Sequence, residues 1–103
     1  MLSAVNPWRH LLRSVQSELD RLGQEIEGRA VMPNEVEIVL PGASHERWAP
    51  VLSRITAELG GALVAWAERG RRAWYDDRGP FLAVRLEGDS GGPPQITCKF
   101  RRG

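Results

Sequence analysis

The spacing of apolar residues changes between two periods along this chain, and that change limits the folds open to it. In residues 8–26 and 48–66 apolar side chains recur every three or four positions, which places them along one side of a helix. In residues 34–40, 81–86 and 95–101 they recur at every second position, as in half-buried strands. The sequence therefore predicts an α+β fold in which helices and strands each bury one face.

Capping residues and helix breakers indicate where the two helices begin and end. Residues 6–7 are Asn-Pro, an N-cap and first-turn pair, and Gly28 predicts the end of the first helix near that position. Ser44 is a candidate cap for the second helix, Pro50 favours a loose first turn, and Gly70 predicts its end.

Gly60 and Gly61 lie next to each other inside the second helical stretch. Together they cost a helix interior about 2 kcal/mol. We expect them to allow close backbone approach to a neighbouring element; the alternative is a helix broken in two.

The expected element order is α-β-α-β-β-β. A short strand in residues 72–76 and a turn at 77–80 precede the strand at 81–86, which suggests a hairpin. Two helices on one face of a three- or four-stranded mixed sheet would hide every apolar stripe and leave the other face in water. A crossover through the second helix would make the strands on either side of it parallel, and the last two strands are expected to pair antiparallel.

The chain is expected to form a single domain over residues 1–103, because 103 residues rarely build two cores. No apolar run approaches the roughly 18 residues of a membrane span, and the N-terminus lacks the apolar core of a secretory signal. We therefore expect a cytoplasmic protein without membrane insertion. One cysteine, Cys98, excludes an intramolecular disulfide and a four-cysteine zinc site.

The residues with chemical potential do not form a recognisable catalytic pattern. Cys98 lies on the apolar side of a predicted strand, and neither His10 nor His45 has a metal-binding partner at helical spacing. Asp76 and Asp77 are adjacent, so their side chains point to opposite faces or belong to a turn. We expect no catalytic residue, no metal site and no cofactor, and hence not an enzyme.

Charge is unevenly distributed along the chain. Residues 1–68 hold six Arg or Lys against nine Asp or Glu, a sum of −3, and residues 69–103 hold eight against four, a sum of +4. The basic end, with its aromatic residues, suits an anionic protein surface or single-stranded nucleic acid, unless it is only a solubilising rim. No GXXG loop lies between two short helices, which is where K-homology RNA-binding domains carry it. The candidate partner-binding residues are Arg71, Arg72, Trp74, Arg85, Lys99 and Arg101.

One long segment carries a family resemblance. It reads MPNEVEIVLPGASHERWAPVLSRITAELGGALVAWAERGRRAW, continued by GPFLAVRLEGD. Its motifs are at residues 32–35, at 46–50, and at 79–80 with Val84, Arg85 and Glu87. In order and spacing they resemble the N-terminal domain, of unknown function, of actinobacterial forkhead-associated protein A.

The resemblance implies a non-enzymatic adaptor module. In that family the domain commonly precedes a linker and a forkhead-associated domain that binds phosphothreonine, in proteins of serine/threonine-kinase signalling and cell-envelope control. The matching residues lie between about 10 and 101 and do not include that second domain, so phosphothreonine binding is not carried over. We expect an adaptor that docks an unidentified protein partner; the alternative is a small RNA- or DNA-binding domain. A homodimer through the edge strand that carries Thr97 and Lys99 is a further expectation, although charges there discourage pairing.

Overall fold

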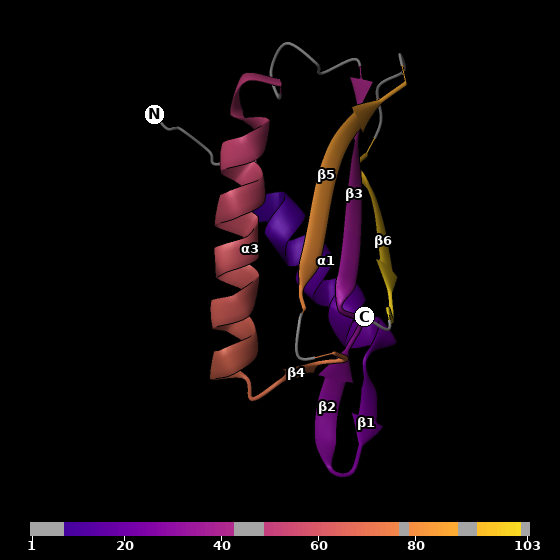
Figure 1. Ribbon diagram of the computed structural model, residues 1–103. Coiled ribbons are helices and arrows are strands. Elements are labelled where there is room, and N and C mark those ends of the chain that lie inside the picture. Colours follow the sequence, from indigo (N-terminus) through magenta and orange to yellow (C-terminus); the bar gives the residue numbers. More distant parts are fainter. Residues whose placement is uncertain (1–7, 43–48, 77–78, 89–92, 102–103) are drawn as a thin grey trace.

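The computed structural model describes residues 8–42, 49–76, 79–88 and 93–101. Within these residues two helices and six strands form an elongated α+β molecule of 45 × 30 × 20 Å, which confirms the predicted fold class (Figure 1). In chain order the elements are α1 (Trp8–Leu22), β1 (Gln24–Ile26), β2 (Arg29–Met32), β3 (Glu35–Pro41), the short 3-10 helix η2 (Ala49–Val51), α3 (Leu52–Arg69), β4 (Ala73–Trp74), β5 (Phe81–Glu87) and β6 (Gln95–Lys99).

The strands form two mixed sheets of three strands each. The main sheet has the order β5-β3-β6, with β3 parallel to β5 and antiparallel to β6. The small sheet has the order β1-β2-β4, with β2 antiparallel to β1 and parallel to β4. Because β2 runs almost directly into β3 and β4 leads to β5, a single crossover through α3 creates both parallel pairs. A parallel crossover through the second helix was predicted, but between residues 34–40 and 72–76. In the structure β3 is parallel to β5 and β4 is parallel to β2, so the predicted partners were wrong.

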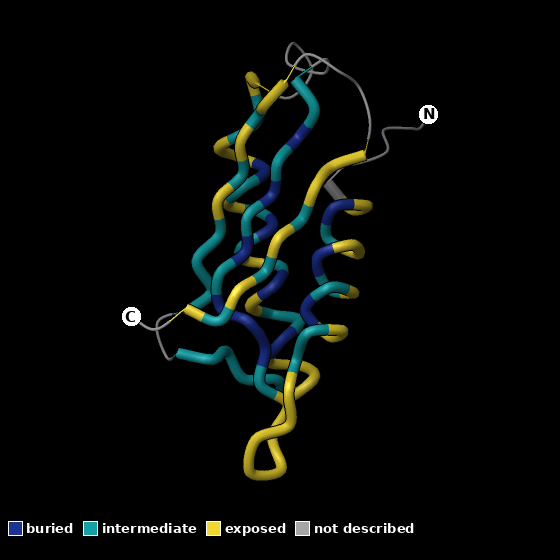
Figure 2. The backbone as a smooth tube through the Cα atoms, turned by 90° about the vertical axis from the view of Figure 1, so that its right-hand side faces the viewer, coloured by how far each residue is buried: buried dark blue, intermediate teal, exposed yellow. Residues whose placement is uncertain are grey.

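Both helices cover the same face of the main sheet, α1 against β6 and α3 against β5. Figure 2 shows the buried residues gathered between the helices and the sheet. The half-buried indoles of Trp66 and Trp74 pack against this core. The buried apolar side chains are Leu11, Val15, Leu19, Met32, Val36, Ile38, Leu40, Ile55, Leu59, Leu63 and Ala67.

The first helix ends earlier than the sequence suggested. It stops at Leu22, and the next residues form the β1-β2 hairpin. Glu27 and Gly28, with φ of 53° and 78°, make its turn; consecutive positive φ values are typical of a tight hairpin turn. Ile26 extends the helical apolar spacing in the sequence but is 42% exposed in β1. Ile26 therefore follows the helical spacing without being buried, and the prediction of a helix to Gly28 was wrong.

The expected hairpin between residues 72–76 and 81–86 is also wrong. The backbone does turn there, since Gly79 N–H donates to the carbonyl of Asp76 at 3.0 Å, but β4 pairs with β2 and β5 pairs with β3. Likewise β5 and β6 do not pair with each other, because β3 lies between them. The three inward side chains of β3 are all fully buried, and the central position buries an apolar strand better than an edge does.

The second helix, α3, begins at Leu52 after the 3-10 turn η2 at Pro50, and it ends at Arg69 before Gly70, as predicted. The loose first turn was predicted over residues 44–49, most of which lie outside the described residues. It is continuous, so the broken-helix alternative is wrong. A Cβ at Gly60 would lie 4.0 Å from Cδ2 of Leu82, an ordinary contact, and one at Gly61 would meet nothing within 4 Å. Close backbone approach therefore does not explain the glycine pair. The cap predicted at Ser44 lies outside the described residues.

Candidate functional site

The side of the main sheet opposite the helices is its open face. No described element covers it, and Figure 1 shows both helices on the other side. Side chains alternate between the two sides of a strand, so inward Val36 and Ile38 leave Glu35 and Glu37 on the open face. Their neighbours follow from the strand register. The open face comprises Glu35, Glu37, Val39, Pro41, Phe81, Ala83, Arg85, Glu87, Gln95, Thr97, Lys99 and, just after β6, Arg101.

The charges of the open face are balanced and largely paired. Arg85 lies 3.6 Å from a carboxylate oxygen of Glu37 and 3.1 Å from one of Glu87, and Arg101 lies 3.7 Å from one of Glu35. The paired side chains are 37–58% exposed. Exposed pairs of this kind contribute little to stability, so a partner can replace them at small cost.

A shallow hollow of about 170 Å³ lies in the middle of the open face. Glu37 is opposite Ala83 on β5 and Thr97 on β6. The short side chains of Ala83 and Thr97 leave space between the longer side chains around them. The guanidinium of Arg101 lies 5.1 Å from the ring centroid of Phe81 at one end of it. A hollow of this size accepts one inserted side chain and is smaller than the usual pocket for a cofactor.

Asn34 fixes the geometry at this end of the open face. Its side chain is completely buried. Its Nδ2 donates to the carbonyl of Arg101 at 2.8 Å, and the Arg101 N–H donates to its Oδ1 at 2.7 Å. Its own carbonyl accepts from the Phe81 N–H at 2.7 Å. One buried amide residue therefore holds the backbones of Phe81 and Arg101 in place on either side of β3.

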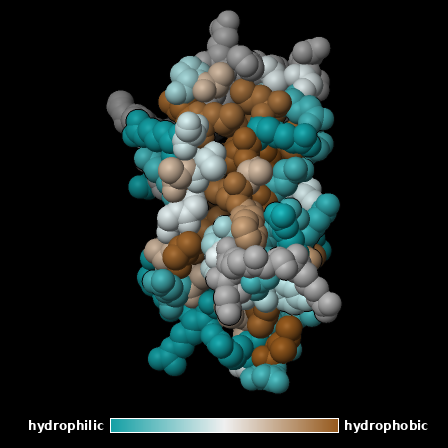
Figure 3. Space-filling view, viewed as in Figure 1, coloured by the Kyte–Doolittle hydropathy of each residue, from teal (hydrophilic) through white to brown (hydrophobic). Residues whose placement is uncertain are grey.

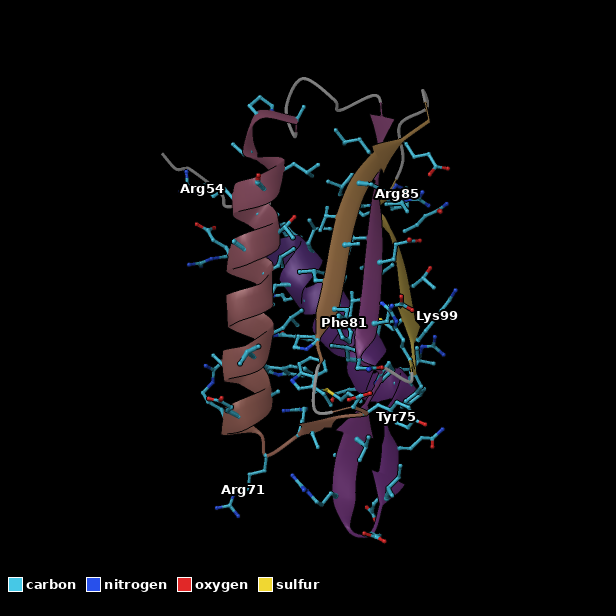
Figure 4. The ribbon with its side chains drawn as sticks, in the orientation of Figure 1. Arg54, Arg71, Tyr75, Phe81, Arg85 and Lys99 are labelled. Carbon is cyan, nitrogen blue, oxygen red and sulfur yellow. The ribbon has the colours of Figure 1, made fainter. Side chains whose placement is uncertain are left out.

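The six candidate partner-binding residues separate into two groups in space. Arg85, Lys99 and Arg101 share the open face, whereas Arg71 lies beyond the end of α3 (Figure 4). Lys99 forms no ion pair within the part of the chain that is described. These candidate residues therefore lie in two separate regions of the surface.

Arg72 and Trp74 are engaged within the fold. Arg72 donates two hydrogen bonds to the carboxylate of Asp20, at 2.9 and 3.2 Å, and its guanidinium lies 4.1 Å from the ring centroid of Trp66. It ties the end of α1 to the end of α3. Trp74 is half-buried and packs against the core. These contacts give both residues a structural role, while binding by them remains a prediction.

The sequence reasoning missed the acidic half of the open face and the role of Asn34. Alternation in residues 34–40 already placed Glu35 and Glu37 on the side opposite the apolar stripe. The sequence did not show that β3 pairs with both β5 and β6. This pairing places the carboxylates of Glu35 and Glu37 between the cations of the open face. Asn34 falls in the motif at residues 32–35, but nothing in the sequence indicated its hydrogen bonds, because its partner is 67 residues away.

Cys98 and His10, two potentially reactive groups, lie apart from the open face. Burial raises the pKa of the Cys98 thiol to about 11, with a smaller upward contribution from the Glu18 carboxylate that Arg21 partly offsets. Cys98 is therefore a neutral thiol near neutral pH and a poor nucleophile. His10 is exposed on α1, and His45 and Asp77 lie outside the described residues. Within the described ranges no three His, Cys, Asp or Glu side chains group as metal ligands.

Taken together, these features define a small α+β domain with helices on one side of a mixed sheet and an uncovered, mixed-charge surface on the other. Its fold is similar to a solved structure of the N-terminal domain of Rv0020c, a protein of the forkhead-associated protein A type, with a TM-score of 0.68. The match covers 97% of this chain and 83% of that chain at 14% sequence identity, so it establishes similarity of fold. No family model and no curated protein matches the sequence. No helix in the described residues is long and apolar enough to cross a membrane.

Proposed function

We propose that this domain is a non-enzymatic, cytoplasmic interaction module that docks a protein partner on its open face. The observation that carries the proposal is the uncovered main sheet with charges of both signs around a hollow for one side chain. A partner of matching chemistry presents acidic groups to Lys99 and Arg101, basic groups to Glu35 and Glu37, and one anchoring side chain to the hollow. Such anchors contribute most of the binding energy in protein interfaces.

The charge balance favours a protein over a nucleic acid as the partner. Nucleic acid binding depends on cations that are free to neutralise phosphates. On the open face Arg85 and Arg101 lie beside carboxylates, and elsewhere Arg72 forms an ion pair with Asp20. A surface with equal numbers of acidic and basic groups suits a protein surface that is itself mixed in charge.

We place this module in signalling that involves forkhead-associated proteins, with serine/threonine-kinase pathways or cell-envelope regulation as its setting. Two observations support this setting. The motifs at residues 32–35, 46–50 and 79–80 resemble that family, and the fold is similar to the Rv0020c N-terminal domain. Phosphothreonine recognition belongs to a different domain of the family and is not assigned to this chain.

The test compares a charge-reversed open face with an equally charged control. In Lys99→Glu/Arg101→Glu the basic side of the open face becomes acidic. In Arg9→Glu/Arg13→Glu the same charge change falls on exposed positions of α1. Each purified protein is used for quantitative affinity capture from lysate of the source organism, and captured proteins are then retested as purified binders.

We expect at least one purified partner whose affinity falls about tenfold or more in the open-face variant, a loss of roughly 1.4 kcal/mol or more. The α1 control should bind it within about twofold of the unmodified protein. Partners that bind both variants equally well would contradict the proposal. A mobility shift with RNA or DNA that weakens as salt rises and is lost in the open-face variant would assign the face to nucleic acid instead.

A further inference from the structure

The outer edge of β5 is unpaired within the described residues. β5 lies at one end of the β5-β3-β6 order. The Phe81 N–H points toward β3, because it donates to the Asn34 carbonyl at 2.7 Å. Backbone N–H and C=O groups reverse direction at each successive residue of a strand. The amide and carbonyl groups of Leu82, Val84 and Leu86 therefore point away from β3, toward the outer edge.

An apolar seam runs beside this edge. Figure 3 shows a hydrophobic stripe between α3 and β5. A Cβ at Gly60 would lie 4.0 Å from a methyl group of Leu82, so this side of α3 faces β5. Ala57 and Val64 share that side of the helix, three residues before and four residues after; Ala57 is exposed and Val64 is 38% exposed. The β5 seam is defined as Ala57, Gly60, Val64, Leu82, Val84 and Leu86.

The other edge of the main sheet is protected differently. β6 carries Lys99 and lies beside α1, where Glu18 and Arg21 form an ion pair. Burial raises the pKa of Cys98 in β6, and the charges of both α1 residues also act on that pKa, which places them close to this strand. Charged side chains are a common means of preventing an edge from pairing. The β5 seam, on the helix side of β5, has no charged member. The charged residues of β5, Arg85 and Glu87, are on the open face and pair with each other at 3.1 Å, so no unpaired charge protects this edge.

We propose that two copies of this chain pair antiparallel along β5, with Val84 on the two-fold axis. The strand has seven residues and Val84 is its centre. In that register Leu82 of each copy faces Leu86 of the other, and the outward backbone groups of the two strands can exchange six hydrogen bonds. The result is one six-stranded sheet with the order β6-β3-β5-β5-β3-β6.

A second copy fits this edge because the edge is complementary to itself. On the helix side, apolar residues meet apolar residues. On the open face, Arg85 meets Ala83 and Glu87 meets Phe81, so no like charges are directly opposed. Arg85 is already neutralised by Glu37 and Glu87 of its own chain. The small residues Ala57 and Gly60 let the two α3 helices approach, since small side chains shorten the distance between packed helices.

The oligomeric state of the full chain tests the proposal. Sedimentation velocity over a concentration series should show a monomer–dimer equilibrium. Val64→Arg places a long charged side chain in the β5 seam and should raise the dimer dissociation constant about tenfold or more. Ala65→Arg is the matched control: it adds the same side chain at the next position of the helix, about 140° around the helix axis from Gly60, which faces β5. It should change the constant by less than about twofold.

Amide hydrogen exchange supplies an independent readout at the strand itself. Protection of Leu82, Val84 and Leu86 should rise with protein concentration and fall in Val64→Arg, while circular dichroism shows that the variant stays folded. A monomer at every concentration, or a dimer that Val64→Arg and Ala65→Arg weaken equally, would overturn the proposal. This outcome is separate from loss of the proposed function, since Lys99 and Arg101 lie at the opposite side of the sheet and partner binding is measured through them.

Discussion

Asn34→Ala should be strongly destabilising. The substitution removes two hydrogen bonds of 2.8 and 2.7 Å between the buried amide side chain and the backbone of Arg101. Each such bond contributes about 1 kcal/mol net, and a buried group left without its partner costs about 1–3 kcal/mol more. Arg101 is near the chain end, where water can satisfy part of its backbone, so we expect a loss of about 2–4 kcal/mol in the free energy of unfolding. A domain of this size has about 5–15 kcal/mol in total.

The assay is urea unfolding followed by tryptophan fluorescence, with Gln95→Ala on exposed β6 as the control. A loss under about 1 kcal/mol in Asn34→Ala, within the range of ordinary surface substitutions, would refute the reasoning.

A second variant, Asn34→Asp, tests the direction in which stability changes with pH. The introduced carboxylate can accept from the Arg101 N–H but cannot donate to its carbonyl, and burial raises the pKa of a carboxyl in the folded state. Because the folded pKa then exceeds the unfolded value of about 3.9, this variant should be least impaired at low pH and lose stability as pH rises above about 4. A gain in stability with rising pH would mean that the introduced carboxylate is well solvated and that the Asn34 side chain is not buried as described above.

Three further outcomes follow from individual side chains. The thiol of Cys98, with its pKa raised to about 11, should react slowly with thiol reagents at pH 8 in the folded protein and rapidly in urea; equal rates would show that burial does not control it. Gly61→Ala should stabilise the protein by about 0.5–1 kcal/mol in urea unfolding, since the added methyl meets nothing within 4 Å and removes backbone freedom from the unfolded chain. Gly79→Ala should destabilise it by about 1–3 kcal/mol, because the new Cβ would lie 2.7 Å from Cβ of Asn34; a melting temperature equal to that of the unmodified protein would contradict this.

Local pattern was sufficient for most of the elements. The apolar stripes of α1 and α3 and the strand β3 are defined by residues a few positions apart in the sequence, and each was predicted. The failures share one cause. Ile26 continued a helical spacing, and residues 72–76 preceded a turn, yet both segments joined the small sheet. Their partners are distant in sequence, and periodicity carries no information about distant partners.

The sequence by itself determined that this chain is an α+β protein with its apolar faces on two helices and its strands, because apolar burial follows a period that neighbouring residues define. Tertiary structure alone decided that β3 occupies the centre of the main sheet, that Glu35 and Glu37 stand between cations from two other strands, and that Arg72 binds Asp20. Those arrangements depend on which segments meet in space. That choice is made by the free energy of the whole packed core, to which Asn34 and Arg101 contribute across 67 residues.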